Sequence, residues 1–158
     1  MKIDLVWSDK MLFEARSGEH RVPVDALPPI GSNRGMSPKA LLLSAIASCT
    51  AMDVVAMLRK YKQTLESFAV AVEAPISEGG HPKRFTRADL TFDVRGEVDP
   101  AILLKSVKLS QTMYCGVSAM LSRAFPIAYQ VMLNGAPIGD GEADFDRAST
   151  HEKGGTPA

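Results

Sequence analysis

Residues 35–55 read GMSPKALLLSAIASCTAMDVV, and this apolar stretch decides the fold class. Ser37 is a favourable helix N-cap, and Pro38 suits the first helical position, where its missing N–H is not needed. The basic residues at 59, 60 and 62 complement a C-terminal helix dipole, so the pattern predicts a helix that runs to about Tyr61. Between residues 40 and 58 only Asp53 is charged, so the helix lacks a polar stripe and must be covered on several sides.

The same segment is long enough to suggest a membrane span. A charged Asp53 near the centre of a span costs about 2.5–3.5 kcal/mol, and the chain has no second apolar segment to shelter it. We therefore expect a buried helix and no membrane partner. A chain of 158 residues has little material with which to cover such a helix, which predicts a homodimer.

The sequence before the helix predicts a three-stranded antiparallel meander. Its strands are short, partly alternating apolar runs separated by turn residues, and a Pro- and Gly-rich loop at 26–37 leads into the helix. The three predicted strands are residues 3–7, 11–16 and 20–25.

The sequence after the helix predicts a hairpin, two helices and a last strand. Asp99-Pro100 has the form of a helix start, and Pro126 ends the helical region. The methionines at 52, 57, 113 and 120 are predicted to pack in the core. The predicted elements are strands 67–76 and 84–95, a helix from 99, a short helix from about 115 to 124, and a strand at 127–133.

The predicted fold class is α+β, with the order β-β-β-α-β-β-α-α-β. One domain covers residues 1–134. Residues 135–158 are polar and rich in Gly and Pro, so this segment is predicted to be a disordered tail.

Composition excludes several functions. Eighteen basic residues balance eighteen acidic ones, which predicts no nucleic-acid partner. The chain opens on MKIDLVWSDK with no leader pattern, so we expect a cytoplasmic protein whose two cysteines are free thiols. The three histidines, at 20, 81 and 151, share no ligand spacing with the cysteines, so no metal is predicted.

The local surroundings of the two cysteines predict different acidities. Cys49 lies in the middle of the apolar helix with Asp53 one turn away, and both burial and a negative neighbour raise a thiol pKa. Cys115 lies near a helix start, where the dipole and free amides favour a thiolate. Local sequence therefore favours Cys115 as the more acidic thiol.

Two motifs resemble those of a known family. Residues 35–55 resemble the first cysteine motif of OsmC/Ohr-like proteins, and SQTMYCGVSAML at 110–121 resembles the second. The match is closest to the OsmC subgroup that has Cys-x-x-x-Asp in its helix, here Cys49 and Asp53. The resemblance covers roughly residues 1–134.

The resemblance implies an intertwined homodimer and a thiol-dependent hydroperoxide reductase with peroxiredoxin-like chemistry. By this resemblance, Cys49 attacks an organic or hydrogen peroxide and becomes a sulfenic acid, which Cys115 then captures as a disulfide. An external dithiol resets the pair, and no cofactor is expected. Here the resemblance, rather than local acidity, assigns Cys49 as the attacking thiol.

The sequence departs from the family at the residues that support the thiol. Family peroxidases keep an arginine over the reactive cysteine, oriented by a glutamate just after the helix-start proline, but Lys39 occupies that position here. Arg16, Arg21 and Arg34 are the candidate arginines. Arg34 is preferred because its loop precedes the cysteine helix, and Asp53 could orient it. The alternative is a non-catalytic dimer that binds a small apolar or electrophilic ligand near Cys49.

Overall fold

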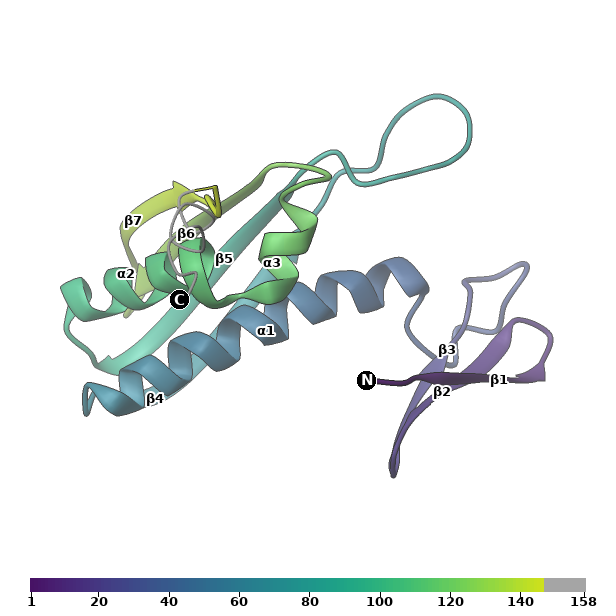
Figure 1. Cartoon of the computed structure of the whole chain (residues 1–158), viewed down its shortest axis with the longest axis horizontal. Coiled ribbons are helices and arrows are strands. Elements are labelled where there is room, and N and C mark those ends of the chain that lie inside the picture. Colours follow the sequence, from purple (N-terminus) through teal and green to yellow (C-terminus); the bar gives the residue numbers. More distant parts are fainter. Residues whose placement is uncertain (147–158) are drawn as a thin grey trace, which may run out of the picture. The chain divides into compact units, whose positions relative to one another are not determined.

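The computed structural model describes residues 1–146, which divide into an N-terminal unit, Met1–Ser44, and a C-terminal unit that begins at Ala45 (Figure 1). Helix α1, Pro38–Lys60, belongs to both. The family-like α+β order predicted from the sequence is confirmed, with one further strand at its end.

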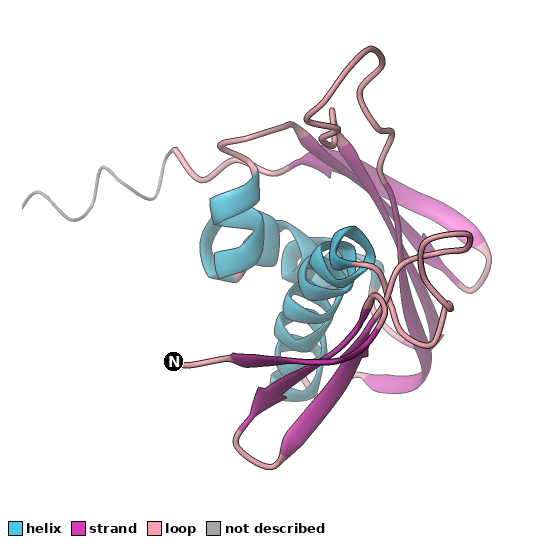
Figure 2. Cartoon of the chain, turned by 90° about the vertical axis from the view of Figure 1, so that its right-hand side faces the viewer, coloured by secondary structure: helices cyan, strands magenta, loops and turns pink. Residues whose placement is uncertain are grey.

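The N-terminal unit is the predicted antiparallel meander of β1 (Asp4–Asp9), β2 (Leu12–Ser17) and β3 (His20–Val24) (Figure 2). Its register places Leu5 opposite Ala15, and Ala15 opposite Val22. The next residues along β1 and β2 show the other face, where Asp4 pairs with Arg16. Since side chains alternate along a strand, one face of this sheet is apolar and the other largely polar.

Helix α1 begins as predicted, because the Ser37 hydroxyl accepts the N–H of Ala40 at 3.3 Å. The chain itself buries a single stripe, four residues apart at each step: Ile46, Thr50, Val54 and Leu58. The cover on several sides that we predicted is therefore not supplied by one chain. By length and composition α1 could cross a membrane, a test that the core helix of a soluble protein also passes.

The C-terminal unit contains a four-stranded sheet in the order β4-β5-β6-β7. The predicted hairpin is β4 (Thr64–Glu73) and β5 (Ala88–Glu97), which pair antiparallel, whereas β6 (Ile127–Leu133) runs parallel to β5. A parallel pair needs a crossover, and the segment between β5 and β6 supplies it as helices. Figure 2 shows the helices of this unit gathered on one face of its sheet.

The crossover consists of α2 (Pro100–Leu109), a π-helical turn η1 (Ser110–Tyr114) and α3 (Gly116–Leu121). Asp99 caps α2 by accepting the N–H groups of Ala101 and Ile102, as its position before Pro100 predicted. The core of the unit lies on β5, where Phe92 is fully buried between the rings of Phe68 and Tyr129.

The predicted tail from residue 135 is wrong at its start, because Ala136–Glu142 forms β7 on the edge of the sheet. The segment has little β propensity, but two of its glycines leave room for neighbours. A Cβ at Gly141 would lie 2.5 Å from the Tyr129 hydroxyl, and one at Gly139 would lie 2.7 Å from Leu104. Tertiary contacts therefore select a strand that composition alone does not predict. The tail prediction for 147–158 lies outside the described residues.

The prediction that the methionines pack in the core is also wrong for three of them within a single chain. Met52, Met113 and Met120 are exposed, and only Met57 is partly covered.

Candidate functional site

The fold brings Cys49 and Cys115 together from distant parts of the sequence. Cys49 lies in the middle of α1, and Cys115 lies between η1 and α3. The two Sγ atoms and a carboxylate oxygen of Asp53 all lie within 4.8 Å of one another. Cys49, Asp53 and Cys115 therefore form one cluster, as the sequence motifs predicted for the two thiols.

The π-helical turn positions the second thiol. The backbone N–H of Cys115 donates to the carbonyl of Ser110 at 2.9 Å, which is the wider bond that defines a π turn. Such turns occur frequently at functional sites. Here the turn ends α2, directs Ser110 and Gln111 towards α1, and places Cys115 as the N-cap of α3.

A chain of side-chain hydrogen bonds joins the π turn to α1 and ends at Asp53. The Ser110 hydroxyl donates to Oδ2 of Asp53 at 2.9 Å, so it must accept the proton of the Thr50 hydroxyl, 2.8 Å away. Thr50 in turn accepts from the amide of Gln111 at 2.8 Å. Every donor in this chain points towards the carboxylate. Thr50, Ser110 and Gln111 lie within the two cysteine motifs, but sequence reasoning missed them because nothing local indicates that their side chains meet.

The two thiols differ in exposure, and burial changes the acidity of Cys115. Cys49 is partly exposed, whereas Cys115 is fully buried. Burial raises the pKa of Cys115 to about 11, and the nearby Cys49 adds to this, although contacts with Ser118 act in the opposite direction. The N–H of Ser118 donates to the Cys115 sulfur at 3.3 Å. The helix start was expected to lower the pKa of Cys115, and desolvation raises it instead.

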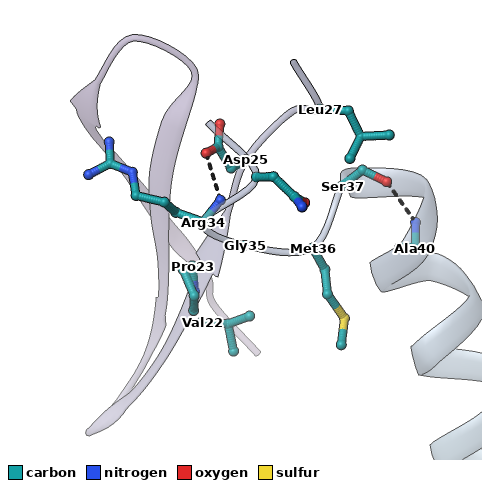
Figure 3. Close-up of a pocket in the computed structure, with 10 residues that line it drawn as sticks. Val22, Pro23, Asp25, Leu27, Arg34, Gly35, Met36, Ser37 and Ala40 are labelled. Carbon is teal, nitrogen blue, oxygen red and sulfur yellow. Dashed lines mark hydrogen bonds between the residues drawn. The ribbon is translucent and has the colours of Figure 1, made fainter. Parts of the chain in front are cut away.

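The predicted supporting residues Arg34 and Lys39 both belong to the N-terminal unit. The Arg34 guanidinium pairs with Asp9 at 3.4 Å, and Figure 3 shows its side chain pointing away from Ser37 and Ala40. Lys39 is exposed on the first turn of α1. Their part in the chemistry of Cys49 therefore stays a prediction.

The alternative arginines, Arg16 and Arg21, flank Glu14 on the polar face of the first sheet. Their Nε atoms lie 2.6 and 3.6 Å from its carboxylate. Both guanidiniums thus already have a carboxylate partner within the meander.

Asp25 organises the loop that carries Arg34. Its nearly buried carboxylate accepts the backbone N–H groups of Ala26, Ser32 and Arg34, and these bonds lower its pKa. The loop borders a cavity of about 650 Å³ (Figure 3). No sequence pattern predicts this role of Asp25, because its hydrogen-bond partners are backbone groups.

A shallow depression of about 290 Å³ opens beside Asp53, bordered by Met57, Lys60 and Tyr114. The cluster is thus reachable on the Asp53 side.

The family model for OsmC-like proteins matches residues 31–130, which include both cysteines and the whole hydrogen-bond chain. The chain belongs to the OsmC-like family. It is 30% identical to the Escherichia coli protein YhfA over 132 residues, which cover 82% of this chain and 95% of YhfA.

Solved structures of OsmC-like proteins share the fold. The OsmC-like protein of Mycoplasma pneumoniae superposes with a TM-score of 0.73 at 18% identity, covering 84% of this chain and 95% of that one. An organic hydroperoxide resistance protein of Elizabethkingia anophelis gives a TM-score of 0.64 at 14% identity, over 85% and 97% of the two chains. At these identities the likeness concerns the fold alone.

Proposed function

We propose that this OsmC-like protein is a thiol-dependent hydroperoxide reductase. The observation that carries the proposal is the approach of the Cys49 and Cys115 sulfurs to within 4.8 Å. Two thiols this close can form a disulfide after a small side-chain movement. Structural neighbours named as organic hydroperoxide resistance proteins share this fold.

In this proposal Cys49 attacks and Cys115 resolves. Cys49 is the partly exposed thiol, so a peroxide can reach it, whereas Cys115 is fully buried and has its pKa raised to about 11. The Cys49 thiolate attacks one peroxide oxygen, releases an alcohol or water, and becomes a sulfenic acid. Attack by Cys115 then forms the disulfide, and an external dithiol reduces it, so no bound cofactor is required.

The reductase is proposed to act as a cytoplasmic homodimer. One chain leaves large apolar side chains exposed on α1, on the π turn and on the first sheet, among them Leu42, Met52, Met113, Leu5 and Trp7. A second copy would cover such a surface, and obligate interfaces typically bury roughly 2,000 Å² or more. A dimer still intact at nanomolar concentration in sedimentation is the expected result, and a cooperatively folded monomer at micromolar concentration contradicts it.

Trapping the intermediate tests the order of the two thiols. Cys115→Ser should consume one equivalent of peroxide and stop at a Cys49 sulfenic acid that dimedone captures, whereas Cys49→Ser should be inert. In the wild type, mass spectrometry should find one intrachain disulfide. A sulfenic acid on Cys115 would reverse the roles. Wild-type cysteines that stay reduced under peroxide would rule out the reductase.

The second candidate is a non-catalytic dimer that binds a small apolar or electrophilic ligand near Cys49. Lys39 at the family's glutamate position favours it, as does the depression beside Asp53, which Met57 and Tyr114 border. Peroxide consumption in the presence of a dithiol reductant separates the two candidates, since a binding protein would show no turnover.

A further inference from the structure

The resolving step poses a problem of proton transfer that the two cysteines alone do not solve. Cys115 must lose its proton before it can attack the sulfenic acid. Its sulfur is fully buried, and burial raises its pKa to about 11 in the reduced protein, so this thiol is protonated at neutral pH. A base next to this thiol would remove the obstacle.

Asp53 is placed to be that base. One of its carboxylate oxygens lies within 4.8 Å of both sulfurs, a separation that one side-chain rotation or one bridging water closes. Ser110 donates one hydrogen bond to Oδ2, so the carboxylate keeps other lone pairs that can take a proton. In the hydrogen-bond series Gln111, Thr50, Ser110, each group donates to the next, and the Ser110 hydroxyl donates to Asp53. The carboxylate is therefore held in place as an acceptor.

Ser118 is placed to stabilise the thiolate that would form. Its backbone N–H already donates to the Cys115 sulfur at 3.3 Å. Its hydroxyl is buried, and the interaction of the Ser118 side chain with the sulfur lowers the pKa of Cys115. A developing negative charge on Cys115 would therefore meet two donors from one residue.

We propose that Asp53 accepts the proton of Cys115 as this thiol attacks the Cys49 sulfenic acid, and then returns the proton to the hydroxide that leaves. The S–S bond forms as the S–O bond of the sulfenic acid breaks. The sulfenic sulfur is reduced, the Cys115 sulfur is oxidised, and hydroxide departs as water. Asp53 ends the step as a carboxylate. This inference rests on the proposed function and assigns Asp53 to its second step.

The test compares wild type with Asp53→Asn after one equivalent of hydrogen peroxide. Asp53→Asn should still oxidise Cys49, but its sulfenic acid should persist, with disulfide formation slowed by about 10²–10⁴-fold. In the variant, the rate of disulfide formation should rise tenfold per pH unit towards the Cys115 pKa of about 11. The wild-type rate should depend less steeply on pH.

The titratable groups that face Cys115 from α1 are Cys49 and Asp53, with Lys60 and Tyr114 at the edge of the depression beside Asp53.

Two further variants control the experiment. Asp53→Glu keeps the carboxylate and should restore part of the rate of disulfide formation. Asp140→Asn makes the same chemical change at an exposed position of β7 and should resolve at the wild-type rate. Circular dichroism and a cooperative thermal transition report whether Asp53→Asn is folded.

Several outcomes would overturn the inference while the reductase stands. In one such outcome the wild type forms the disulfide, and Asp53→Asn forms it at the same rate. Another is loss of Cys49 oxidation itself in Asp53→Asn, with activity regained in Asp53→Glu, because Asp53 would then act in the first step. If Asp53→Asn does not fold, the wild type alone decides. A rate of disulfide formation that rises tenfold with every pH unit below the Cys115 pKa would show that Asp53 does not act as a base. A wild type without any disulfide instead removes the proposed function.

Discussion

The two sheets of the chain differ in how much of their apolar surface they bury. On β5, Leu90, Phe92 and Val94 are buried because helices and neighbouring strands cover them. On β1, Leu5 and Trp7 lie on the apolar face of the meander and are 57% and 62% exposed. The C-terminal unit thus makes its own core, while the N-terminal unit has an amphipathic sheet without one.

If the proposed homodimer forms, this difference separates residues that stabilise the chain itself from residues that a second copy would cover. A three-stranded sheet needs its apolar face packed to be stable in water. The exposed face of the meander and the exposed side of α1 are therefore expected to lose water on dimerisation, whereas the β4–β7 core is expected to hold in either state.

The largest effect on stability is expected for Phe92→Ala in the core of the C-terminal unit. Phe92 is fully buried between two aromatic rings, so its truncation should lower the free energy of unfolding by about 3–5 kcal/mol. Chemical denaturation at several protein concentrations measures this. A loss below about 1 kcal/mol would show that this core is not what stabilises the C-terminal unit.

The same well-packed unit buries Cys115, which makes stability depend on pH. Burial raises the pKa of Cys115 from its ordinary value of 9.0 to about 11 in the fold. The folded state therefore holds more protons between these two values, and stability should fall by roughly 2 kcal/mol as pH rises from 9 to 11. Denaturation of the reduced protein tests this, and Cys115→Ala should remove most of the slope. An unchanged slope would mean that other groups cause it.

A smaller effect is expected for Leu5→Ala on the uncovered sheet. If a second copy covers Leu5, the change should cost about 2 kcal/mol per subunit and raise the dimer dissociation constant more than tenfold. Val6→Ala is the matched control, since Val6 lies beside Leu5 on the opposite face of β1. Sedimentation equilibrium measures both variants. Equal dissociation constants for both would contradict cover of the apolar face.

The smallest effect on stability is expected for Arg34→Ala. Its ion pair with Asp9 is exposed, so the free energy of unfolding should change by no more than about 0.5 kcal/mol. The rate of Cys49 oxidation should nevertheless fall about tenfold if Arg34 favours the thiolate. Arg16→Ala, which loses only its contact with Glu14, is the control. Equal oxidation rates for both variants would remove Arg34 from the site.

The sequence by itself determined most of the backbone of this protein. The Ser37-Pro38 start, the apolar run to Lys60 and the alternation in β4 and β5 are local patterns, and the structure shows helix and strands there. The pairing of the two cysteines was also expected, because each belongs to a recognisable motif.

Only the tertiary structure decided the surroundings of the thiols. Thr50, Ser110 and Gln111 meet across segments some 60 residues apart, and no local pattern records such a meeting. The acidity of Cys115 was predicted with the wrong sign, since a helix start is visible in sequence but complete desolvation is not. β7 was missed because glycines at 139 and 141 suit a strand only where Leu104 and Tyr129 fill the space beside them. Local periodicity specifies the backbone, whereas burial and long-range contacts set the chemistry of its side chains.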